Sequence, residues 1–198
     1  MKTNNIKITA IVGSLRQGSL NHQLAFEAGK ALKAAAAEQD LGTVDFEILD
    51  YSDVPLFNQD NEHPAPDAVK RIREIVKSSN GIWFFSPEYN HFFPGVLKNL
   101  IDWLSRPVSD TEGQVLGGKP AAVSGISPGI SGTGIAQDHL VTLISFLNMK
   151  VMNLPRLTIP NALQQVDQNG RLTLSSSAPF LEKQAKAFIQ FIFYHEPH

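Results

Sequence analysis

Two kinds of hydrophobic spacing alternate along the chain. Short stretches rich in β-branched and aromatic residues are typical of buried strands, whereas apolar positions that recur every three or four residues indicate helices. The strand-like stretches are Ile6–Val12, Val44–Asp50, Gly81–Phe85, Lys119–Ile126 and Lys150–Leu154. Apolar strands that alternate with helices predict a parallel sheet covered by helices on both faces.

Helical spacing occupies most of the chain between these strands. The predicted helices are a segment from Leu20 to at least Ala35, Asp67–Ser79, a segment that starts near Pro94, Ala136–Leu147 and Leu181–Ile192. Residues 156–172 are predicted to form a loop or an excursion at the sheet edge that turns at Asn169-Gly170. With no internal repeat or linker, we expect residues 1–198 to form a single α/β domain. Its sheet would be doubly wound, parallel and five-stranded, with strand order 2-1-3-4-5.

Composition narrows the range of functions. The chain has 198 residues, a net charge of −2 and no cysteine. Without a basic block, we expect no nucleic-acid partner and no attraction to an acidic membrane surface. The lack of cysteine excludes disulfides, zinc–thiolate sites and thiol chemistry, and it is consistent with a cytoplasmic protein. The six histidines lack metal-ligand spacing, so no metal site is expected, and no apolar run could cross a bilayer.

The stretch "GSLRQGSLN", Gly13–Asn21, links the first predicted strand to the first helix. A turn rich in glycine and serine at such a junction is typical of a phosphate site. It lacks both the lysine of nucleoside triphosphatase loops and the second glycine of dinucleotide-binding loops. We therefore expect a single terminal phosphate here, faced by Ser14, Arg16, Ser19 and Asn21. The alternative is that Ser19 only caps the helix and Asn21 lies on the surface.

Two further loops follow the third and fourth predicted strands. They are "SPEYNHFFPG", Ser86–Gly95, and "SGISPGISGTG", Ser124–Gly134. The predicted strand order makes the first, third and fourth strands neighbours, so all three loops should meet at one crevice. The second loop would present backbone amides and Asn90 to the edge of a planar ring, or it would only start the next helix. The glycines of the third loop permit close backbone approach, or only a flexible turn.

The three loops together resemble those of one known family. The stretches "GSLRQGSLN", "PEYNHFFPGVLKNLIDWLSRP" and "GKPAAVSGISPGISGTGIAQDHL" are similar to the NAD(P)H-dependent FMN reductase family of flavodoxin-like proteins, which includes bacterial quinone, azo-dye and chromate reductases. The similarity runs from about Ile6 to Leu154. It implies a flavodoxin-like fold, FMN as cofactor and NADPH or NADH as co-substrate. One departure is "ISGTG" in the third loop, where the family often has paired glycines.

The resemblance also implies residue roles. The first loop would hold the FMN phosphate, the second would line the isoalloxazine and ribityl chain, and the third would close the other side. The implied cofactor-binding residues are Ser14, Leu15, Arg16, Ser19, Asn21, Pro87, Glu88, Tyr89, Asn90, Ser124, Gly125 and Ser127. Hydride would pass through flavin N5 to a quinone, azo compound or similar small-molecule acceptor in ping-pong turnover. No side chain need be catalytic, although His91 is an alternative proton donor.

Two other functions stay open at this stage. An electron-carrier flavodoxin would lack a nicotinamide site, and a flavin-binding regulatory protein would not turn over NAD(P)H. Carriers of that type tend to be strongly acidic and to have a threonine-rich phosphate loop. This nearly neutral chain, with Arg16 in its first loop, fits a carrier less well.

We also expect a homodimer or homotetramer. The third predicted helix and its flanks carry Phe92, Phe93 and Trp103, more apolar surface than one sheet contact covers, and exposed apolar patches usually mark interfaces. The family resemblance implies pairing through the same region. The alternative is that the loop after the second strand, with Leu56 and Phe57, folds over these rings within one chain.

Overall fold

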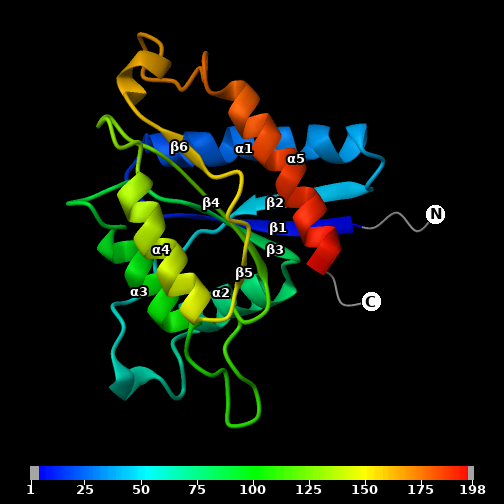
Figure 1. The fold of residues 1–198 in the computed structure, drawn as a ribbon. Coiled ribbons are helices and arrows are strands. Elements are labelled where there is room, and N and C mark those ends of the chain that lie inside the picture. Colours follow the sequence, from blue (N-terminus) through cyan, green and yellow to red (C-terminus); the bar gives the residue numbers. More distant parts are fainter. Residues whose placement is uncertain (1–4, 196–198) are drawn as a thin grey trace.

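A parallel β-sheet lies between two layers of helices in the computed structural model, which describes residues 5–195 (Figure 1). The strands are β1 Asn5–Val12, β2 Thr43–Ile48, β3 Gly81–Phe85, β4 Pro120–Ile126, β5 Lys150–Val151 and β6 Leu157–Ile159. The helices are α1 Leu20–Glu38, α2 Asp67–Ser78, α3 Gly95–Leu104, α4 Gly134–Phe146 and α5 Ala178–His195. Short 3-10 turns lie at Gln59–Asn61 and Ala162–Gln165. No helix within the described range has an apolar stretch long enough to span a bilayer.

The strand order is β2-β1-β3-β4-β5 with every pairing parallel, which confirms the predicted order and the flavodoxin-like fold. Helices α1 and α5 cover one face of the sheet, and α2, α3 and α4 cover the other (Figure 1). The central strands β3 and β4 are therefore buried at every residue. Burial on both faces explains why β3 consists of glycine and large apolar residues only.

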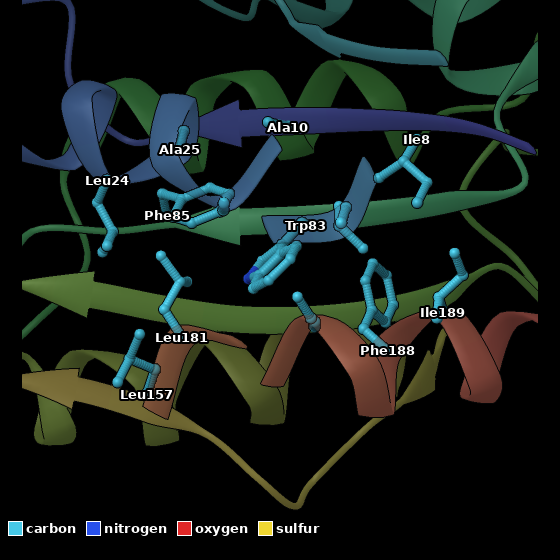
Figure 2. Packing of buried hydrophobic residues seen from close by; sticks show 14 of the residues in the cluster. Ile8, Ala10, Leu24, Ala25, Trp83, Phe85, Leu157, Leu181, Phe188 and Ile189 are labelled. Atoms are coloured by element: carbon cyan, nitrogen blue, oxygen red, sulfur yellow. The ribbon is translucent and has the colours of Figure 1, made fainter. Parts of the chain in front are cut away.

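Aromatic rings of β3 fill both sides of the sheet. Successive side chains of a strand point to opposite faces, so Trp83 and Phe85 lie beneath α1 and α5, whereas Phe84 lies beneath the other helix layer. The ring of Trp83 stacks on that of Phe85 with centroids 5.2 Å apart. It also meets the edge of Phe188 from α5 at 5.4 Å (Figure 2). These rings join α5 to the centre of the sheet.

The fifth position of the sheet is shared by two short strands. β5 pairs with the start of β4, and β6 pairs with its end, from Ser124 to Ile126. The predicted strand Lys150–Leu154 is therefore too long, and of the two alternatives for residues 156–172 the excursion at the sheet edge applies at Leu157–Ile159. Pro155 lies between the two pieces, and proline has no amide hydrogen to donate to a neighbouring strand. On the side that faces β5 and β6, the interruption leaves the middle of β4 without a strand partner.

Gln184 of α5 supplies the missing contacts. Its Nε2 donates to the carbonyl oxygens of Val123 and Pro155, each at 3.0 Å. Its Oε1 accepts from Ser124 Oγ at 2.6 Å, and Ser124 Oγ accepts in turn from Trp83 Nε1 at 2.8 Å. All of these side chains are fully buried. A buried polar group is tolerated only when it is hydrogen-bonded, and this network meets that condition.

The long connection after β2 covers the aromatic surface of α3. Trp103 is fully buried: its Nε1 donates to Pro55 O at 2.8 Å, and the ring of Phe57 meets it edge-on at 4.9 Å. Phe93 is also buried, whereas Phe92 is 44% exposed. The expectation that all three rings are exposed was therefore wrong for Phe93 and Trp103. The loop folds over Trp103 within one chain, as in the alternative interpretation, through Phe57, whereas Leu56 is 84% exposed.

The last helix is longer at both ends than its apolar spacing predicts. α5 begins at Ala178 and continues to His195, so Tyr194 and His195 of the final "YHEPH" are helical. The remainder of that segment, which the sequence suggests is frayed, lies outside the described residues.

We expect Gln184→Leu to lower the free energy of unfolding by about 2–4 kcal/mol, because it nearly keeps the side-chain volume but leaves buried groups without partners. Urea unfolding of the apoprotein, followed by circular dichroism, measures the change. Lys183→Leu, at the exposed neighbouring position, is the control and should alter stability by less than about 0.5 kcal/mol. A Gln184→Leu protein as stable as the wild type would contradict the role given to this network.

Candidate functional site

Three loops meet at the carboxyl ends of β1, β3 and β4, as the predicted strand order requires. We call residues 13–19 the first loop, 86–94 the second and 127–133 the third. The first two are in close contact, because a Cβ added to Gly13 would lie 3.4 Å from Ser86 Oγ and from Pro87 Cδ. The second meets the end of β4 through the Ser86 amide, which donates to Ser124 O at 3.0 Å. The loops form one packed unit at the edge of the sheet.

The first loop presents hydrogen-bond donors that the protein itself leaves unused. Within the described residues, no protein acceptor binds the amides of Ser14, Leu15, Gln17, Gly18, Leu20 and Asn21. Arg16 is exposed, and its Nη2 donates to Gly18 O at 3.0 Å. Gly18 takes a positive φ of 71°, and nothing lies within 4 Å of where its Cβ would be. Open amides at a helix N-terminus suit a phosphate, which brings only acceptors and negative charge.

Ser19 caps α1, with its Oγ accepting from the His22 amide at 3.4 Å. This agrees with the alternative interpretation of Ser19, and a contact with phosphate stays a prediction. Asn21 is not on the surface, because only 3% of it is exposed. Its Nδ2 donates to Ile126 O at 2.9 Å, and its Oδ1 accepts from Ile126 N at 3.1 Å. The carboxamide thus ties the start of α1 to the end of β4.

Two cavities flank the first loop and share Arg16, Gln17 and Gly18. A groove of about 1030 Å³ lies toward α1 and the 163–173 segment, and a cavity of about 430 Å³ lies toward the end of β2. The hydroxyl of Tyr51 borders the smaller cavity and donates to Val12 O; burial raises its pKa, so it stays a donor. The loop backbone is accessible from both sides.

The second loop is a tight two-residue hairpin. Tyr89 and Phe92 exchange backbone hydrogen bonds of 2.8 and 3.0 Å, and the residues between them, Asn90 and His91, have φ values of 53° and 61°. Two successive left-handed residues define the hairpin turn that best matches strand twist. The amides of Glu88, Asn90 and His91 have no protein acceptor in the described part of the chain. The loop is therefore rigid and offers donors at its tip.

The side chain of Glu88 extends toward α4, and Nδ1 of the tip residue His91 lies 3.8 Å from its Oε1. Its Oε1 accepts from Ser131 Oγ at 2.8 Å, and its Oε2 accepts from the Ala136 amide at 3.0 Å. Only 9% of the side chain is exposed. Desolvation acts to raise the pKa of Glu88, but hydrogen bonds from Ala136 and Ser131, together with His91, outweigh it and lower the pKa overall. The carboxylate is an anion held by the third loop and α4. The sequence predicted a cofactor contact for Glu88 and gave no sign of this contact with Ser131.

The third loop differs most from expectation. Ser124 is fully buried and its Oγ is bound to Trp83 and Gln184 on the α5 side of the sheet, so its side chain does not close the crevice. A Cβ on Gly125 would collide with Thr133 Oγ1 and Ser86 O, so this glycine permits close packing of the protein on itself. Ser127 is 7% exposed. The open donors here are the amides of Gly129, Ile130, Ser131, Gly132 and Thr133, which bind no acceptor in the described chain.

The groups that these loops present are suited to binding a ligand more than to acid–base catalysis. Backbone donors and one arginine dominate, and the only titratable pair at the loops is Glu88 with His91, whose Nδ1 lies 3.8 Å from Oε1. Within residues 5–195, no group of three or more acidic or histidine side chains could hold a metal ion. The donor set fits a flavin phosphate at the first loop and polar ring atoms at the other two. Reaction chemistry would then come from the bound cofactor.

The chain is similar to several known oxidoreductases. The sequence model of the NADPH-dependent FMN reductase family matches residues 6–164. The chain is 37% identical to a 2-hydroxy-1,4-benzoquinone reductase of a Burkholderia species, over 89% of this chain and 91% of the relative. It is also 37% identical to an NAD(P)H-dependent FMN reductase of Pseudomonas aeruginosa, over 93% and 94% of the two chains. The flavoenzyme NAD(P)H:(acceptor) oxidoreductase FerB from Paracoccus denitrificans aligns structurally with a TM-score of 0.80 and 33% identity, covering 96% and 98% of the chains.

The family match covers all three loops, and it confirms the resemblance seen in the sequence. The same match supports the assignments of FMN as cofactor, of NAD(P)H as co-substrate and of an oxidoreductase activity. The chain belongs to the NADPH-dependent FMN reductase family.

Proposed function

We propose that this enzyme reduces quinones and similar small planar acceptors with NAD(P)H in a ping-pong cycle. The observation that carries the proposal is the meeting of three loops with open backbone donors at one edge of the sheet, without a side-chain acid–base pair aimed into the crevice. The names of several relatives support a quinone as acceptor. They include a 2-hydroxy-1,4-benzoquinone reductase and quinone reductases of Pseudomonas putida and Escherichia coli.

The first loop would bind the FMN phosphate. Its open amides, those of Ser14, Leu15, Gln17 and Gly18, would donate to the phosphate oxygens, and the Arg16 guanidinium would add a charge-assisted hydrogen bond. Ser14 Oγ and Ser19 Oγ are close enough in sequence to contribute, and Leu15, which is 49% exposed, would lie at the ring side. Asn21 would act indirectly, through its hold on Ile126.

The second and third loops would hold the ring system. Pro87, Tyr89 and Asn90 would line one edge, and the open amides of the hairpin tip would donate to ring oxygen and nitrogen atoms. Ser127 and the amides of Gly129 and Ile130 would close the opposite side. Ser124 and Gly125, near the end of β4, would hold the third loop in place through the packing of the strand that leads into it. Donors fixed near a site of developing negative charge stabilise that charge without reorganisation.

One shared binding place explains the ping-pong order. When bound, FMN supplies the hydride chemistry, taking two electrons from the nicotinamide and passing them to the acceptor. The protein would hold the ring between the second and third loops and would leave room for one planar molecule at a time. Exposed apolar side chains around the crevice favour planar, weakly polar acceptors; they are Leu15, Tyr89, Phe92, Val96, Ile130 and Ile135.

The order of binding makes a kinetic prediction. Double-reciprocal plots of initial rate against NAD(P)H, at several fixed concentrations of a benzoquinone, should give parallel lines. Lines that intersect to the left of the axis would mean that both substrates bind together. A protein that binds FMN but does not oxidise NAD(P)H would instead support the electron-carrier or regulatory alternatives.

Arg16→Ala should weaken FMN binding by about 1.5–3 kcal/mol, the usual contribution of a hydrogen bond to a charged group. Fluorescence titration of the apoprotein with FMN measures the dissociation constant. Riboflavin, which lacks the phosphate, should bind the variant and the wild type equally well. Lys33→Ala, which removes an exposed cation of α1 that lines neither cavity beside the first loop, is the control and should bind FMN normally. An unchanged FMN affinity in Arg16→Ala would exclude Arg16 as a phosphate contact.

We further propose that the enzyme is a homodimer or homotetramer. The burial of Phe93 and Trp103 removes part of the original reason, but the exposed residues around the crevice still include Tyr89 and Phe92. Light scattering after size exclusion should give a multiple of the 21.7 kDa chain mass. Phe92→Ser should shift the subunit dissociation constant upward by about tenfold or more. Phe146→Ser, at a phenylalanine that is 84% exposed on α4, should not; a monomer at micromolar concentration would refute the proposal.

A further inference from the structure

Helix α4 begins without a capping side chain of its own. The residue before it, Thr133, has a left-handed φ of 76° and makes no side-chain hydrogen bond to the helix amides. Its Oγ1 instead accepts from Gln137 Nε2 at 3.0 Å, deep in the protein. Serine and threonine before a helix normally accept from its first free amides. Here the inward packing of Thr133 against Gly125 leaves that task to another residue.

Glu88 of the second loop performs the task from 48 positions away. Its Oε2 accepts from the amide of Ala136, in the first turn of α4, at 3.0 Å. Its Oε1 accepts from Ser131 Oγ, just before the helix, at 2.8 Å. A carboxylate at a helix N-terminus is also favoured by the helix dipole. Both oxygens of Glu88 are therefore engaged by the third loop and by α4, and the side chain is almost fully covered.

We infer that Glu88 is a positioning residue that fixes the distance between the second and third loops, and that it is not a direct flavin ligand. Two residues after Glu88 stands Asn90, whose amide is open, and just before Ser131 stand the open amides of Gly129 and Ile130. The Glu88 contact thus joins the two loops that carry these donors. The inference rests on the proposed placement of the flavin ring between these loops.

This assignment separates two parts of flavin binding. The phosphate part depends on the first loop, which neither Glu88 nor Ser131 contacts through a hydrogen bond. The ring part depends on the gap between the second and third loops. A substitution of Glu88 should therefore weaken the binding of riboflavin and of FMN by the same factor, whereas a substitution of Arg16 should weaken only the binding of FMN.

The binding experiment compares Glu88→Gln, Ser131→Ala and the double variant by titration of each apoprotein with FMN and with riboflavin. Glu88→Gln should weaken both flavins by roughly tenfold, as expected when a charged acceptor is lost from buried donors. The FMN-to-riboflavin affinity ratio should stay that of the wild type. The visible absorbance and circular dichroism of the bound flavin should change, because the ring sits in an altered gap.

The double variant distinguishes positioning from direct contact. If Glu88 acts through Ser131 and α4, the double variant should bind flavin about as well as Glu88→Gln alone, because interacting residues are non-additive. If the two effects multiply, Glu88 contacts the flavin directly and the inference is wrong. Glu74→Gln, at an exposed glutamate of α2, is the matched control and should leave both affinities and the spectrum unchanged.

A measurement on the apoprotein tests the contact without any flavin. Amide hydrogen exchange at Ala136 should accelerate by about tenfold or more in Glu88→Gln, and much less in Glu74→Gln, because the amide loses its charged acceptor. Unchanged exchange would overturn the inference even if the enzyme is an FMN reductase. Conversely, a wild type that binds no flavin would refute the proposed function, while the exchange result would still decide whether Glu88 caps α4.

Discussion

The parallel register of three strands is the constraint on which the rest of the structure depends. Val12 of β1 pairs with Phe85 of β3, and Phe85 pairs with Ser124 of β4, so one row of residues crosses the sheet just before the loops begin. Because the three strands end at nearly the same level, their loops must leave the sheet side by side. A shift of register in any one strand would move its donors out of the crevice.

Side-chain contacts between loops convert this proximity into a defined shape. Asn21 binds the backbone of Ile126 and thereby holds the start of α1 against the end of β4. Glu88 holds the second loop against α4. Glycines at positions 13 and 125 let neighbouring backbone and side chains approach where a Cβ would obstruct them. Open amides can bind a ligand selectively only if they are held in place, and these contacts hold them.

On the side of β4 that faces β5 and β6, the neighbouring strand is interrupted, and a side chain replaces the missing hydrogen-bond partner. Where β5 gives way to β6, the Val123 carbonyl loses a strand partner, and Gln184 of α5 replaces it. The same glutamine binds Ser124, which binds Trp83 in the core. A polar network within an otherwise apolar layer thus holds the end of β4, from which the third loop leaves the sheet. Such networks favour a unique arrangement only when every member is satisfied.

The sequence by itself determined the five helices, the order of strands β1 to β5 and the meeting of three loops at one edge of the sheet, but it did not show β6 as a strand. Gly81–Phe85 was predicted with its observed limits, because five apolar residues between turn signals leave few alternatives. The first loop could be singled out as a candidate phosphate site from the glycines and serines between a strand and a helix. These features depend on residues close together in the chain, and short-range patterns record them.

Only the tertiary structure decided which side chains face the site. The sequence places Ser124 where a strand passes into a site loop, yet its side chain points into the core. There it binds Gln184, which is 60 positions away along the chain. Asn21 and Glu88 are engaged by backbone groups 105 and 48 positions distant. Trp103 is buried by a loop that begins after β2. The direction of a side chain depends on partners brought together by folding, and no local spacing encodes them.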